Sequence, residues 1–195
     1  MVTNSYQAIV IGASAGGIEA LSTILSGLPN RFYPPIVIVE HVGNNDITPL
    51  IHCLADCSNI TIEEATPNEI IYPNTIYIAP SGYHLLIEEN KHFSLSVDPE
   101  VNYARPSIDV LFESAADAYK NRIVAILLSG ANSDGTEGLL AIKNVGGFTI
   151  AQSPETAAIA TMPQSAINAN AAELVLPLDK IAPYLMSLPF TDAAE

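Results

Sequence analysis

The chain has 195 residues, of which 49% are apolar and 14% charged, and this balance excludes an intrinsically disordered protein. Seven basic residues stand against 21 acidic ones, and the net charge of −14 disfavours nucleic acid and anionic lipid as partners, because both attract proteins through their phosphates. No apolar run has membrane-spanning length and none resembles a signal peptide, so we expect a cytoplasmic protein without membrane insertion, folded as one domain over residues 1–195.

The first strong pattern is an apolar strand that runs into a glycine-rich turn and then into a helix. Residues 8–11 read Ala-Ile-Val-Ile, without the alternation of a half-exposed strand, and predict a parallel strand covered on both faces. Gly12, Gly16 and Gly17 permit a tight turn, after which apolar residues recur at helical spacing as far as Leu28.

Ser14 lies within this turn, and the local pattern leaves three interpretations open. Gly12 and Gly17, with Glu40 after the next strand to hold a ribose, fit a dinucleotide-binding turn, although Ser14 stands where that motif needs a glycine. Residues 12–16 (Gly-Ala-Ser-Ala-Gly) also fit the Gly-x-Ser-x-Gly form that projects a nucleophilic hydroxyl above a strand. The third interpretation is a serine that only caps the helix.

The second buried strand, residues 36–39, leads to Glu40 and His41, and a helix is expected from about residue 48 to 58. This helix carries Cys53 and Cys57, with His52 beside them. Zinc sites usually take four ligands from spaced pairs, and no second pair is present, so we expect reduced, mostly buried cysteines and no metal.

The remaining elements complete an alternation of strands and helices. In the first half of the remaining chain we expect short strands between 59 and 79, a hairpin over 84–88 and 92–97, a loop over 102–106 and a helix from 108 capped by Ser107. In the second half we expect strands over 123–128, 148–151 and 174–176, helices over 136–144 and 180–188, and a loop containing Pro154 and Pro163. This order predicts an α/β fold with a doubly wound, mainly parallel, Rossmann-like three-layer sheet and an additional antiparallel β-hairpin.

Three polar residues follow buried strands of this predicted sheet. Ser14, His41 and Asp134 should lie at its carboxyl edge, and a hydroxyl, an imidazole and a carboxylate are the groups of a serine hydrolase. Taken singly, His41 has the simpler interpretation of a hydrogen-bonded residue at a strand end, and Asp134 that of a cap on the helix that follows it. The chain order Ser, His, Asp differs from those of α/β-hydrolases, chymotrypsin and subtilisin.

At these residues the chain resembles the catalytic domain of the CheB-type protein-glutamate methylesterases of bacterial chemotaxis, nearly end to end. The matching stretches are residues 11–17, 40–42, 78–84, 105–112, 128–130 with 134–135 and Gly138, and 160–163. The resemblance implies hydrolysis of methyl esters on glutamates of methyl-accepting chemoreceptors and deamidation of receptor glutamines. It assigns Ser14 as nucleophile, His41 as base and Asp134 as orienting acid, with no cofactor.

Backbone amides near Ala15 and Ala131 are expected to bind the oxyanion. The family's Gly-Met-Gly loop reads Gly130-Ala131-Asn132 here, and we expect Asn132 to keep the loop shape because asparagine tolerates left-handed dihedrals.

Other departures concern the surroundings of the site. Glu40 replaces a glutamine that is common in the family, but neighbouring strand side chains point in opposite directions, so Glu40 need not touch His41. Arg105 is a candidate cation at the substrate rim, together with Tyr103.

CheB proteins commonly carry an N-terminal receiver domain, and here Met1 leads almost directly into the first strand, so we expect no receiver domain. A stand-alone or differently regulated homologue, with a separate receiver-domain or kinase partner, and a chain whose receiver was removed both remain open. A weak or inactive CheB-like signalling module and a dinucleotide-binding protein remain as alternative functions.

Overall fold

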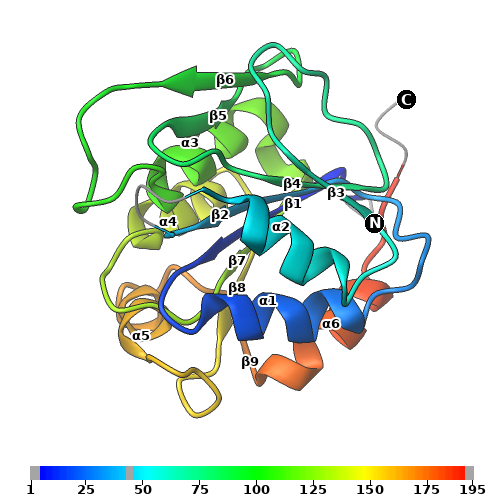
Figure 1. The fold of residues 1–195 in the computed structure, drawn as a ribbon. Helices are drawn as coiled ribbons and strands as arrows, with labels where there is room; N and C mark the ends of the chain where they lie inside the picture. Colours follow the sequence, from blue (N-terminus) through cyan, green and yellow to red (C-terminus); the bar gives the residue numbers. More distant parts are fainter. Residues whose placement is uncertain (1–4, 43–45, 192–195) are drawn as a thin grey trace.

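A computed structural model describes residues 5–42 and 46–191 (Figure 1). Seven strands form one parallel sheet in the order β3-β4-β2-β1-β7-β8-β9, and β5 pairs with β6 in a separate antiparallel hairpin. The predicted α/β fold with an additional hairpin is therefore confirmed. The strands are β1 (Ala8–Ala13), β2 (Ile36–Glu40), β3 (Thr61–Glu64), β4 (Thr75–Ile78), β5 (His84–Ile87), β6 (Phe93–Ser96), β7 (Ile123–Leu127), β8 (Phe148–Gln152) and β9 (Leu174–Leu176).

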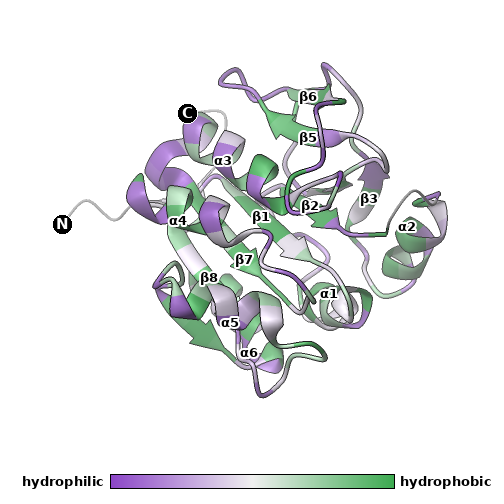
Figure 2. Cartoon of the chain, turned by 90° about the vertical axis from the view of Figure 1, so that its left-hand side faces the viewer, coloured by the Kyte–Doolittle hydropathy of each residue, from purple (hydrophilic) through white to green (hydrophobic). Residues whose placement is uncertain are grey.

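The helices cover both faces of the sheet. The described helices are α1 (Gly17–Ser26), α2 (Thr48–Ala55), α3 (Ile108–Tyr119), which a 3₁₀ turn (Lys120–Arg122) follows, α4 (Thr136–Asn144), α5 (Thr161–Asn168) and α6 (Leu178–Ser187). One buried cluster joins the sheet to α1, α2 and α6, and a second joins it to α3, α4, α5 and the β5–β6 hairpin. Figure 2 shows the central strands as hydrophobic, whereas the helices carry hydrophilic and hydrophobic segments.

The position of β1 determines where a site can form. All six residues of β1 are buried, because its side chains face one core or the other. The chain leaves β1 toward β2 on one side and returns to β7 on the other, so the strand order reverses there. A crevice at the carboxyl end of a parallel sheet opens at such a reversal.

One predicted loop was wrong. Residues 161–168 form α5, although the sequence suggested a loop around Pro163. Pro163 is the third residue of this helix, and amides of the first turn have no intrahelical partner to lose. Met162 and Ala166 are fully buried, so tertiary packing stabilises this short helix. The other predicted elements agree with the structure to within three residues at each end.

The expectation of mostly buried cysteines was also wrong. Cys53 is exposed and Cys57 is partly buried, because α2 turns Leu50 and Leu54 toward the core instead. Within residues 5–42 and 46–191, no group of three or more His, Cys, Asp or Glu side chains is arranged to hold a metal ion. None of the described helices is long and apolar enough to cross a bilayer.

Candidate active site

The parallel sheet brings the ends of β1, β2 and β7 to the same level. Ala13 is in register with Glu40 on β2, and Gly12 is in register with Leu127 on β7. The strand exits are then joined by backbone hydrogen bonds, in which the amide of His41 donates to the Ala13 carbonyl at 3.2 Å. The segments that carry Ser14, His41 and Asp134 therefore start from adjacent points of one sheet edge.

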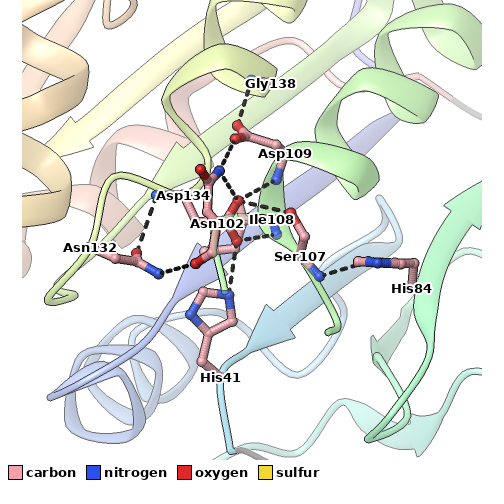
Figure 3. Close-up of polar contacts among 9 residues, drawn as sticks. All are labelled: His41, His84, Asn102, Ser107, Ile108, Asp109, Asn132, Asp134 and Gly138. Carbon is pink, nitrogen blue, oxygen red and sulfur yellow. Dashed lines mark hydrogen bonds and ion pairs between the residues drawn. The ribbon is translucent and has the colours of Figure 1, made fainter. Parts of the chain in front are cut away.

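The structure brings two of the three predicted residues into direct contact. His41 Nε2 lies 2.9 Å from Asp134 Oδ2 (Figure 3). Asp134 is fully buried and accepts four further hydrogen bonds, from the Ser107 hydroxyl at 2.8 Å, the Ile108 amide at 2.7 Å, the Asn102 side-chain amide at 3.1 Å and the Asp109 amide at 3.2 Å. Burial by itself would raise the pKa of Asp134, but these hydrogen bonds outweigh it and lower the pKa to about 2. Asp134 is therefore an anion at neutral pH.

This carboxylate also caps a helix, but not the helix expected from the sequence. The amides of Ile108 and Asp109 open α3, so Asp134 places its negative charge at the positive end of the α3 dipole. The following helix, α4, begins after Gly135 without a side-chain cap. Ser107 occupies the N-cap position of α3, but its hydroxyl donates to Asp134 instead of capping α3.

The contact with Asp134 leaves the second ring nitrogen of His41 available. Since Asp134 is anionic, the Nε2–H tautomer satisfies the contact between them and leaves Nδ1 as an acceptor. Ser14 and His41 line one cavity of about 930 Å³. Among the contacts of the described residues, no hydrogen bond joins the Ser14 hydroxyl to His41. Catalytic hydrogen bonds of this kind are often long before substrate binds.

The interpretation of Ser14 as a helix cap is wrong. The N-cap of α1 is Gly16, whose φ of +80° favours glycine, and no side chain caps this end of the helix. Ser129 fixes the turn instead, because its carbonyl accepts the Ser14 amide at 2.9 Å and its hydroxyl donates to the Ala15 carbonyl at 2.7 Å. The Ser14 side chain is therefore left on the cavity wall.

A second buried carboxyl lies beside the first. The Asn102 side-chain amide donates to Asp109 Oδ2 at 2.7 Å as well as to Asp134, and the Gly138 amide donates to Asp109 Oδ1 at 2.7 Å (Figure 3). Burial, together with the nearby charge of Asp134, raises the pKa of Asp109 to about 7. The two carboxyls therefore differ in charge through most of the acidic range.

The loop residues predicted to surround the oxyanion are Ala15, Ala131 and Asn132, and the structure shows their exposure and backbone conformation. Ala15 and Ala131 are both exposed at the edge of the sheet. Asn132 does not adopt the left-handed backbone that we expected; its side-chain oxygen instead accepts the Asp134 amide at 3.2 Å in a local turn. This turn holds the segment that carries Asp134.

The two predicted rim residues lie close together in the chain but are engaged differently. Arg105 donates through Nη1 to the carbonyls of Val97 and Asp98, each at 3.0 Å, so part of its guanidinium anchors the segment after β6. Tyr103 is 98% exposed at the tip of a turn with φ of +62°. No contact of either residue with the cavity is present among the described residues.

Sequence reasoning missed several residues that hold the site. Ser129 follows a buried strand directly, as Ser14 does, and this position was a usable signal. His84 ends the matching stretch 78–84, but nothing local indicated its contact with Ser107, and Asn102 gave no signal because its partners Asp109 and Asp134 are distant in the chain. His84 accepts the Ser107 amide through Nδ1 at 3.2 Å and contacts the Pro99 carbonyl through Nε2 at 3.1 Å, which ties β5 to the start of α3.

Comparison with known proteins identifies the family of this fold. A relative from Leptospira interrogans is 50% identical over 184 residues, which cover 94% of this chain and 95% of that protein. The protein-glutamate methylesterase/protein-glutamine glutaminase 2 of Caulobacter vibrioides is 40% identical over 185 residues, which cover 93% of this chain but 53% of that protein. The crystal structure of the Thermotoga maritima CheB methylesterase catalytic domain superposes with a TM-score of 0.89 at 36% identity, covering 93% of this chain and 98% of that one. Residues 9–185 match the CheB methylesterase family, and the chain belongs to that family.

Proposed function

We propose that this protein hydrolyses methyl esters of glutamate side chains on methyl-accepting chemoreceptors, and that it can deamidate receptor glutamines at the same site. The observation that best supports this proposal is the 2.9 Å contact between His41 Nε2 and the anionic Asp134, next to the cavity that both His41 and Ser14 line. The Caulobacter vibrioides relative is named as both a protein-glutamate methylesterase and a protein-glutamine glutaminase, which supports the same substrate class here.

The reaction is acyl transfer by a serine nucleophile. The Ser14 hydroxyl attacks the ester carbonyl as its proton passes to His41 Nδ1, and Asp134 stabilises the imidazolium through Nε2. Backbone amides of Ala15 and Ala131, with the loop at Asn132, bind the oxyanion. Methanol, or ammonia from glutamine, leaves with the proton from His41, and water then hydrolyses the acyl-serine to free glutamate. Arg105 and Tyr103 contact the receptor outside the cavity.

The decisive experiment is the Ser14→Ala variant assayed for methanol release from methylated receptor fragments. We expect kcat to fall by a factor on the order of 10⁴ to 10⁶, since the nucleophile is lost, with an unchanged circular dichroism spectrum. Ser26→Ala is the matched control, because Ser26 lies exposed at the last turn of α1, the helix that follows Ser14. Receptor binding without turnover in the wild type would favour a non-catalytic signalling module, and saturable binding of a dinucleotide would favour a nucleotide site.

A further inference from the structure

Glu40 is a buried acid in the wall of the active-site cavity. It ends β2 directly before His41, and strand alternation directs it toward α1 while His41 faces Asp134. Its carboxyl packs against Gly17, where an added Cβ would lie 2.2 Å from Glu40 Oε2. Glycine at the start of α1 thus makes room for this side chain.

The carboxyl of Glu40 has unused hydrogen-bonding capacity. The residue is 5% exposed, and within the described part of the chain its Oε2 has no hydrogen-bond partner. A buried polar atom without a partner costs free energy, so native structures rarely retain one unless function requires it. Glu40 lines the cavity that holds Ser14 and His41. A substrate in this cavity can supply the missing partner.

The surroundings of Glu40 favour its neutral form. The titratable groups that line the same cavity are Glu19 of α1, His41 after β2, and Asp46 and Cys53 before and within α2. The neighbouring strands β1 and β4 direct only uncharged side chains to this face of the sheet, and no lysine or arginine lines the described cavity wall. Burial raises the pKa of Glu40 to about 8, so its carboxyl is protonated and can donate a hydrogen bond at neutral pH.

We propose that Glu40 is a substrate-binding residue that donates its acid proton to an uncharged acceptor oxygen of the receptor segment entering the cavity. This inference rests on the proposed function and adds a specificity element to it. An ionised Glu40 would lack the donor and would repel the negative charge that develops at the reacting carbonyl. Substrate binding should therefore weaken when Glu40 loses its proton, and a neutral amide should replace the acid.

The test is the pH profile of kcat/KM on methylated receptor fragments for the wild type, Glu40→Gln and Glu40→Met. In the wild type we expect kcat/KM to fall as the pH rises through about 8. Glu40→Gln should abolish this fall and keep kcat/KM at pH 7 within about threefold of the wild-type value. Glu40→Met removes the donor without a large change in volume, and kcat/KM should fall about tenfold, mainly through KM. Glu19→Gln removes a charge from the same cavity wall and should retain the alkaline fall.

A binding measurement separates this inference from the proposed activity. The carboxyl carbon of Glu40 is titrated by nuclear magnetic resonance in Ser14→Ala, alone and with the methylated receptor fragment. A higher apparent pKa in the complex supports donation to the substrate even if the wild type shows no turnover, in which case only the proposed activity fails. An active wild type whose pH profile coincides with that of Glu40→Gln, or an unchanged Glu40 titration in the complex, would overturn the inference.

Discussion

Asp109 and Asp134 share one asparagine side chain and differ in charge. Asp134 is held ionised by five hydrogen bonds, whereas the pKa of Asp109 is raised to about 7 by burial and by its charged neighbour. Residue identity did not reveal this difference, since both are aspartates within buried segments. The number of donors that converge on each carboxyl decides which one can stabilise an imidazolium.

This difference predicts unequal effects of two matched substitutions. Asp134→Asn should lower kcat/KM for ester hydrolysis at pH 6 by roughly 10³- to 10⁴-fold, because a neutral amide no longer stabilises charged His41. Asp109→Asn should lower it by less than about tenfold, because an amide N–H replaces the proton that Asp109 already holds below its raised pKa. Equal losses in two variants with native thermal unfolding would contradict the assignment.

The start of α3 is the element on which the site is built. It carries the amides of Ile108 and Asp109 that bind Asp134, and it approaches β1 so closely that a Cβ at Gly12 would lie 2.3 Å from Ile108 Cγ2. The glycine at position 12 therefore permits the helix to reach its place. The sequence pattern suggested a nucleotide or nucleophile turn for this glycine, but its packing against α3 is visible only in the fold.

Gly12→Ala should accordingly displace the start of α3. We expect a loss of about 1–3 kcal/mol in the free energy of unfolding, because an overpacked core forces side chains and backbone apart, together with a loss of esterase activity. Ile108→Ala alone should cost about 2–5 kcal/mol through a cavity. The double variant should lose less than the sum, with a coupling energy of about 1–2 kcal/mol in urea denaturation. Strict additivity would argue against this contact.

At the scale of the whole molecule, the protein carries a strong excess of negative charge. The net charge is −14, and the acidic residues Glu19 and Asp46 line the described cavity beside the protonated Glu40, with no lysine or arginine among the described lining residues. A field of this sign slows the approach of acidic substrates and speeds the departure of the glutamate product. Salt reduces both effects because it shortens the range of the field.

We therefore expect salt to act differently on two substrates. For a receptor fragment of net negative charge, kcat/KM should rise several-fold between about 10 mM and about 150 mM salt, as the Debye length falls from about 30 Å to about 8 Å. A small uncharged glutamyl methyl ester should show little change over the same range. A fall in kcat/KM for the acidic fragment would indicate that a local basic surface, such as one around Arg105, dominates its binding.

The sequence by itself determined the layered α/β fold and the sheet edge at which Ser14, His41 and Asp134 lie, because buried parallel strands and their glycine-rich exits follow from local patterns. It did not determine α5, the exposure of Cys53, the role of Ser107, the buried partners of Asp134 or the burial of the Glu40 carboxyl. Those features depend on contacts between segments distant in the chain, such as α3 with the loop after β7. Only the tertiary structure decides which amides, hydroxyls and carboxyls meet there, and hence which acids keep their protons.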